Sequence, residues 1–214
     1  MFRPRSPVGF LPNLVHVPDR IEEKPPTPTF AFMGRLEGRK RPERFLELAP
    51  RFPECRFAVV GKADSQRRDR RLRERYGAPP NAEWIGYVDE FRDRGKMEAI
   101  LSRSWALVNT SSREGLPISF LEAAAHGCAV VSAVDPDEFA TRFGVRVAEN
   151  DFAGALGTVL HDPAAAFEAA RKVRRYVAEV YEWEKAIDAH LECYRRHLDG
   201  ADGSSLNRPE GGSP

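Results

Sequence analysis

Short apolar runs alternate with helix-like stretches from residue 29 to residue 198. Almost every position within the strand-like runs is apolar, which is typical of parallel strands that are buried on both faces. Strands are predicted at 29–33, 56–60, 83–85, 105–110, 129–132 and 145–147, and helices at 43–52, 65–76, 96–102, 118–126, 152–160 and 164–198, the last with a break near 181–183. The pattern predicts the α/β class, with a parallel sheet covered by helices on both faces and ligands bound beyond the carboxyl ends of its strands.

The composition along the chain divides it into three segments. Residues 1–28 are rich in proline and are predicted to form an irregular hinge or linker. Residues 29–198 are predicted to form a single Rossmann-like domain that ends in long helices. Residues 199–214 are rich in glycine, serine and aspartate, and are predicted to be a disordered tail.

The overall composition argues against several classes of function. The net charge of +1 gives no reason to expect nucleic acid as the main partner. No apolar run approaches the roughly 20 residues that span a bilayer. The three cysteines have no metal-type or redox-type spacing, and the N-terminus lacks the apolar core of a signal peptide. These features predict a cytoplasmic location.

A run of six arginines stands between residues 67 and 75, on one predicted helix. Because Asp69 and Glu74 lie among them, we interpret this run as a solvated helix face with internal ion pairs. The alternative is docking on an anionic surface, which would place the protein peripherally at the inner face of a membrane or on nucleic acid.

The stretch 114–127 holds two carboxylates, one in a turn and one inside a predicted helix. Pro117 stands at the helix start and a glycine follows the helix end. On a helical wheel the apolar residues share one side, whereas Ser119, Glu122 and His126 share the other. His126 is therefore expected to be a solvent-exposed residue at the helix end.

The geometry of this stretch suggests a phosphate-linked ligand. A helix N-terminus offers free N–H groups to a phosphate. Glu114 precedes the helix and can reach a group attached to that phosphate, while Glu122 can accept two hydrogen bonds from a diol such as a ribose. The loop 34–42 adds Arg35 and Lys40, which are suited to phosphate oxygens, beside glycines that allow close approach. The alternative is that all of these are ordinary solvated charges.

These two stretches together resemble the retaining glycosyltransferases of family 4, also called glycosyl transferases group 1, and in particular the C-terminal, donor-binding half of their GT-B fold. The family's G-R-L-x-x-x-K pattern stands at 34–40, and its E-x7-E pattern stands at 114–122. Further similarities are the strand ends at 59–61 and 84–88, the hinge-like 12–15, and the Trp-Glu and Tyr-Arg pairs of the last helix. One departure is Arg41, where the family usually has glycine; this arginine is expected either to strengthen phosphate binding or to be solvated.

The resemblance implies roles for the matching residues. Arg35, Lys40 and Glu114 would be catalytic: the two cations neutralise the donor diphosphate, and Glu114 holds hydroxyls of the transferred sugar. Because the cations serve this purpose, neither a metal nor another cofactor is implied. The donor-binding residues implied by the family pattern are Gly34, Gly61, Tyr87, Val88, Gly115, Leu116, Pro117, Ile118 and Glu122, the last of these for the ribose.

The resemblance also implies a partner. The family's active site lies between two halves, and this chain begins at the hinge, so an N-terminal acceptor-binding domain or subunit is expected from elsewhere. The expected function is transfer of a hexosyl group from a UDP- or GDP-type nucleoside diphosphate sugar, in glycan, glycolipid or exopolysaccharide synthesis. The alternatives are a non-catalytic subunit that binds nucleotide sugars and a truncated remnant.

Overall fold

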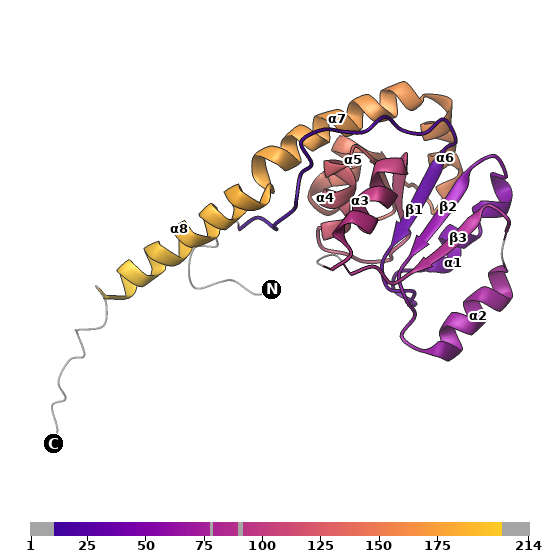
Figure 1. Ribbon diagram of the computed structural model, residues 1–214, viewed down its shortest axis with the longest axis horizontal. Helices are drawn as coiled ribbons and strands as arrows, with labels where there is room; N and C mark the ends of the chain where they lie inside the picture. Colours follow the sequence, from indigo (N-terminus) through magenta and orange to yellow (C-terminus); the bar gives the residue numbers. More distant parts are fainter. Residues whose placement is uncertain (1–10, 78, 90–91, 203–214) are drawn as a thin grey trace, which may run out of the picture.

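The computed structural model describes residues 11–77, 79–89 and 92–202 as one α/β domain (Figure 1). At its centre lies a six-stranded sheet with the order β3-β2-β1-β4-β5-β6, and every pairing in it is parallel. The strands are β1 (Thr29–Met33), β2 (Arg56–Val60), β3 (Ala82–Gly86), β4 (Ala106–Asn109), β5 (Ala129–Ser132) and β6 (Val145–Arg146). The predicted parallel sheet is confirmed.

Helices cover both faces of the sheet. Alternation along β1 sends Phe30 and Phe32 into one core and Ala31 and Met33 into the other. The first core is closed by α1 (Pro42–Leu46), α2 (Gln66–Tyr76) and α6 (Phe152–His161). The second is closed by α3 (Arg94–Arg103), α4 (Ile118–Ala125), α5 (Phe139–Phe143) and α7 (Pro163–Val180).

The prediction and the structure differ most at two helices, while several other elements differ only by one or two residues at their ends. The helix predicted at 43–52 stops at Leu46 and is followed by a 3-10 turn, Ala49–Arg51. Pro50 explains the break, because proline cannot donate a helical hydrogen bond and restricts the residue before it. No helix was predicted at α5, since five residues are too few to show a helical period.

The last helix leads the chain away from the sheet. The predicted long helix is broken between α7 and α8 (Trp183–Asp202), which leads away from the domain (Figure 1). Helix α8 extends past the predicted start of the tail at 199, and the rest of that tail, 203–214, lies outside the described residues. An apolar stripe on α8 is exposed, with Trp183, Ile187, Leu191, Tyr194 and Leu198.

The segment 11–28 contains neither a helix nor a regular strand, yet it is attached to the domain at several points. The backbone N–H of Val15 donates to Tyr181 O at 2.8 Å. The Lys24 ammonium donates to His126 O at 2.8 Å and to Leu101 O at 3.0 Å, and the Trp105 indole donates to Pro25 O at 2.8 Å. This segment therefore covers one end of α3 and α4.

Candidate functional site

The predicted site residues follow four neighbouring strands at one edge of the sheet. Gly34 follows β1, Gly61 follows β2, Tyr87 follows β3, and Glu114 lies in the loop between β4 and α4. Since the carboxyl ends of parallel strands meet at the same edge, the loops that carry these residues converge there.

The ends of β1 and β2 approach each other closely through two glycines. The Gly34 N–H donates to Val60 O at 3.0 Å, and the Gly61 N–H donates to Gly86 O at 2.8 Å. A Cβ atom on Gly61 would lie only 1.8 Å from Gly34 O, and the Gly61 φ of 144° also favours glycine. The glycine at position 61 therefore fixes where the loop after β1 begins.

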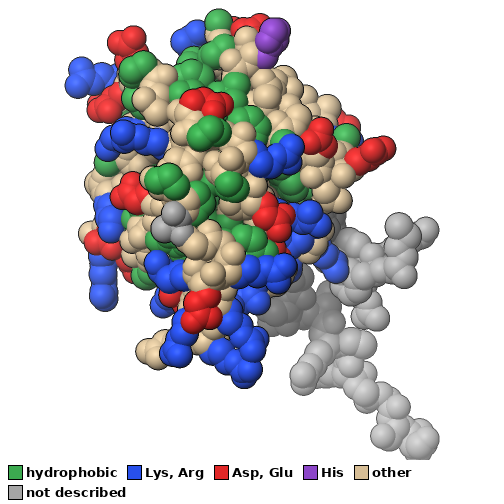
Figure 2. Space-filling model, turned by 90° about the vertical axis from the view of Figure 1, so that its right-hand side faces the viewer, with side chains coloured by type: hydrophobic (Ala, Val, Ile, Leu, Met, Phe, Trp, Pro, Cys, Tyr) green, Lys and Arg blue, Asp and Glu red, His purple; other side chains and the backbone are tan. Residues whose placement is uncertain are grey.

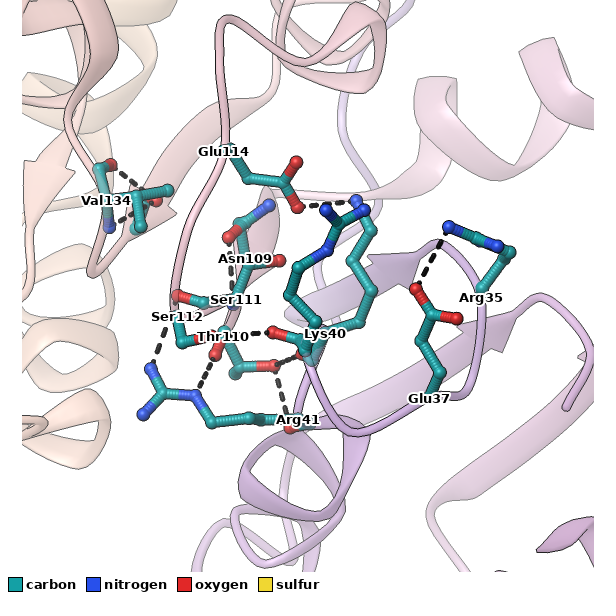
Figure 3. A network of polar contacts seen from close by, with 12 residues as sticks. Arg35, Glu37, Lys40, Arg41, Asn109, Thr110, Ser111, Ser112, Glu114 and Val134 are labelled. Atoms are coloured by element: carbon teal, nitrogen blue, oxygen red, sulfur yellow. Dashed lines mark hydrogen bonds and ion pairs between the residues drawn. The ribbon is translucent and has the colours of Figure 1, made fainter. Parts of the chain in front are cut away.

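Lys40 and Glu114 form the ion pair at the centre of the site (Figure 3). The Lys40 Nζ atom lies 2.5 Å from Glu114 Oε1, and both side chains are largely buried. Burial acts to raise the pKa of Glu114, but the hydrogen bond and the charge of Lys40, together with Ser111 and Arg39, outweigh it and leave that pKa below its usual value. Glu114 is therefore ionised at neutral pH, and a cation and an anion are held side by side.

Arg35 does not join this pair. Its guanidinium lies 3.0 Å from Glu37 Oε1, and its side chain is 67% exposed (Figure 3). The two cations predicted to act together are thus separated in this structure, with Lys40 on Glu114 and Arg35 on Glu37.

Sequence reasoning missed the contacts that join the loop after β1 to the loop after β4. The Arg41 guanidinium donates to Thr110 O at 2.7 Å and to Ser111 O at 3.3 Å. In return, the Thr110 hydroxyl donates to Lys40 O at 2.7 Å. The only hint in the sequence was the polar run at 109–112, which begins at the last residue of β4. Arg41 was expected to face a phosphate or solvent, but in this structure it holds these two loops together.

This role leads to a first prediction. Replacing Arg41 with alanine is expected to lower the free energy of unfolding by about 1–3 kcal/mol, because it removes the bonds to Thr110 and Ser111. Arg41 also has a φ of 47°, so replacement with glycine should cost about 1 kcal/mol less than alanine. Urea denaturation measures both. Arg39→Ala, an exposed neighbour, is the control, and equal losses for alanine and glycine would contradict the backbone argument.

Helix α4 presents its amino end to the same edge of the sheet. Its N-cap residue is Pro117, and no side chain caps its first turn. The backbone N–H groups at this end are therefore available to an anion. Gly115 and Leu116 lead into the helix, and the Ile118 side chain is exposed.

Glu122 lies one turn further along α4 and lines a separate cavity of about 420 Å³. Ile118 and His126 line it from the same helix, Arg94 from α3, and Trp183 from the start of α8. Lys40 and Glu114 are not part of this cavity wall. The structure thus brings Lys40 and Glu114 together, whereas Glu122 lines a pocket to which neither of them contributes.

The prediction that His126 is solvent-exposed is wrong. Only 6% of the residue is exposed, because the segment 11–28 covers this end of α4. The His126 Nδ1 atom lies 2.9 Å from Glu122 O, and burial lowers the pKa of the imidazole. The neutral ring then donates from Nδ1, and its Nε2 atom has no partner among the described residues.

The two residues that follow β3 differ in how far their side chains are exposed. Tyr87 is 58% exposed, and the Lys62 ammonium lies 4.5 Å from the centre of its ring. Val88 is buried in the second core, so only its backbone is available to a ligand.

Across the described residues, no three histidine, cysteine or acidic side chains lie close enough together to hold a metal ion.

Residues 18–178 match the family model described as Glycosyl transferases group 1, which covers more than half of the chain. The chain belongs to this family. It is also 28% identical over 181 residues to the glycogen synthase of Mycobacterium tuberculosis, covering 76% of this chain and 41% of that protein. The chain therefore spans about two fifths of the length of the curated relatives that it matches.

Solved structures of GT-B glycosyltransferases share the fold of this group 1 domain. Sucrose-phosphate synthase from Thermosynechococcus elongatus superposes with a TM-score of 0.71 at 24% identity, over 82% of this chain and 46% of that one. For TarM of S. aureus, in a complex that contains UDP, the TM-score is 0.70 at 19% identity, over 85% and 38% of the two chains. Anabaena HepE in complex with UDP gives 0.65 at 15% identity, over 78% and 48%.

In the described part of this group 1 domain, no helix is both long and apolar enough to cross a membrane.

Proposed function

We propose that this domain binds a nucleoside diphosphate sugar, of the UDP or GDP type, for retaining transfer of its hexosyl group. The observation that supports this most is the Lys40–Glu114 pair, 2.5 Å apart, on loops at the same sheet edge as the uncapped amino end of α4. A cation and free amides suit a diphosphate, and the adjacent carboxylate suits sugar hydroxyls. The UDP in the structures of TarM and HepE is consistent with such a donor.

In this proposal the chain's own groups replace a metal ion. Lys40 lies against the diphosphate and stabilises the charge that grows on it as the sugar leaves. Arg35 reaches the same charge after releasing Glu37, which its exposed position allows. Glu122 binds the ribose diol from its cavity, and the backbone at Tyr87 and Val88 lies near the base. The product would belong to glycan, glycolipid or exopolysaccharide synthesis.

The exposed stripe on α8 supports an acceptor-binding half as partner. Ile187, Leu191 and Tyr194 recur at helical spacing on one face, and Leu14 is exposed in the segment beside the start of α8. Contact with a second half would bury them, exclude water from the site and position the acceptor. The domain alone is therefore expected to bind nucleotide but to transfer little.

The test is a calorimetric titration of UDP, GDP and ADP into the domain and two variants. Glu122→Ala should weaken binding of the preferred nucleotide about tenfold, since it removes a carboxylate that accepts two hydroxyls. Glu179→Ala, an exposed carboxylate on α7, is the matched control and should bind like wild type. A well-folded domain that binds none of the three nucleotides would overturn the proposal.

A further inference from the structure

A groove between α1 and α2 is lined mainly by arginine. Its volume is about 790 Å³. The arginines in its wall are Arg41, Arg44, Arg67, Arg68, Arg71 and Arg75. Only three carboxylates share the wall, those of Glu43, Glu47 and Asp64. Lys and Arg side chains gather at the lower end of the face in Figure 2, the end where Figure 1 places α2.

Three of these arginines form a regular stripe. Arg67, Arg71 and Arg75 recur every four residues on one side of α2, so their Cα atoms rise by about 6 Å from one to the next. Like charges at this spacing destabilise a helix. Within the described part of the chain, no carboxylate oxygen lies within 4.0 Å of any of the three guanidinium groups. No ion pair among the described residues therefore relieves the repulsion within the stripe.

Three acidic groups nearby have other partners, and Glu43 in the groove wall and Glu74 on α2 form no ion pair with the stripe. Asp69 of α2 accepts from Arg73 at 2.7 Å, on the other side of the helix. Glu47 accepts from the Tyr76 hydroxyl at 3.4 Å and lies 3.9 Å from Arg44. Asp64 accepts from the Ser65 hydroxyl at 3.2 Å. The stripe is thus arranged for negative charges from outside the domain that repeat along its length.

The shape and composition of the groove favour one kind of polyanion. A flat bilayer does not enter a groove between two helices, and the single buried apolar residue of α2, Leu72, offers it no anchor. A single-stranded nucleic acid binds through stacking on exposed rings. Here the ring of Tyr76 is covered by the Arg75 guanidinium, 5.6 Å from its centre. A linear acidic polymer without bases is narrow enough to enter the groove and needs no exposed ring for stacking.

We propose that this groove binds a linear acidic glycan, whose carboxylates pair with Arg67, Arg71 and Arg75. Gly38 and Arg41, which line the groove, belong to the loop that carries Lys40 to Glu114. A glycan held in the groove therefore runs toward the proposed transfer site. The inference rests on the proposed function in this respect, because it makes the glycan a candidate acceptor or product chain.

The test is binding of a linear oligouronide to the domain without nucleotide, measured by calorimetry at two salt concentrations. A neutral malto-oligosaccharide of the same length is the ligand control. The double variant Arg67→Gln/Arg71→Gln should weaken oligouronide binding about tenfold, and added salt should weaken it further. Arg70→Gln/Arg73→Gln removes the same charge from the other side of α2 and should change the affinity less than twofold.

Three results would overturn the inference: no oligouronide binding, equal losses in the two double variants, or tighter binding of an oligonucleotide or of anionic lipid vesicles. Circular dichroism confirms that both variants fold. Nucleotide titration of the same samples separates the two proposals. Oligouronide binding without nucleotide binding would refute the donor site and leave the groove, whereas the reverse would refute the groove alone.

Discussion

Replacing Lys40 with methionine is expected to weaken nucleoside diphosphate binding by about 30-fold or more. The substitution removes a buried cation from a charge pair, and such a loss costs about 2–5 kcal/mol. Methionine keeps most of the side-chain volume, so the loss of affinity can be attributed to the loss of the charge. Lys172→Met, an exposed lysine on α7, removes the same charge elsewhere and should leave the affinity unchanged. Calorimetry with the preferred nucleotide measures both.

The same substitution has a pH-dependent effect on stability. With Lys40 present the folded-state pKa of Glu114 is lowered, so the pair stabilises the fold above the unfolded-state pKa of about 4.3. That stabilisation is lost as the pH falls through the folded-state pKa. Without Lys40, burial still raises the pKa of Glu114 while only Ser111 and Arg39 lower it, so that pKa lies higher than in the wild type. The difference in unfolding free energy between wild type and variant should be largest near neutral pH and should shrink in acid.

Either of two results would contradict part of this account of Lys40. If Lys40→Met bound nucleotide as wild type does, the ion pair with Glu114 would be structural and the diphosphate would lie elsewhere. If the stability difference did not change with pH, Glu114 would not be the group that Lys40 stabilises. The two measurements therefore test the binding role and the charge pair separately.

The fold was predictable because local patterns of apolar residues identify its strands and most of its helices. The almost continuous apolar runs of β1, β2 and β5 identify buried parallel strands, and their bounds were predicted to the residue. Parallel strands with helical crossovers then leave few topologies, and all of them bring the strand ends to one edge. The convergence of the loops after β1 and β4 followed from this rule. Helix α5 was missed because its pattern is shorter than two turns.

The details of the site were less predictable because they depend on contacts between distant segments. Arg35 and Lys40 look equivalent in sequence, but Glu37 competes for one of them and Glu114 for the other. The helical wheel placed His126 correctly beside Glu122, but it could not show that a segment about 100 residues earlier covers that side. Arg41 finds its partners 69 residues away. No local pattern encodes these choices.

Replacing Gly61 with alanine is expected to have the largest effect on stability, a loss of about 3–5 kcal/mol. The new Cβ would lie 1.8 Å from Gly34 O and 2.9 Å from Gly34 C. Both are backbone atoms at the end of a central strand, so neither can move without breaking the hydrogen bond from Gly34 to Val60. The positive φ of 144° adds strain for any L side chain. Urea denaturation measures the loss.

Two other glycines separate the causes of that loss. Gly77 has a φ of 53° but open space around its missing Cβ, so Gly77→Ala should cost only the backbone strain, about 1 kcal/mol. Gly115 has open space and no positive φ, so Gly115→Ala should be almost neutral for stability. If Gly61→Ala lost no more than Gly77→Ala, the contact between the ends of β1 and β2 would be looser than the structure has it. Since Gly34 begins the loop that carries Lys40, a loose contact there would also leave Lys40 without a fixed position against Glu114.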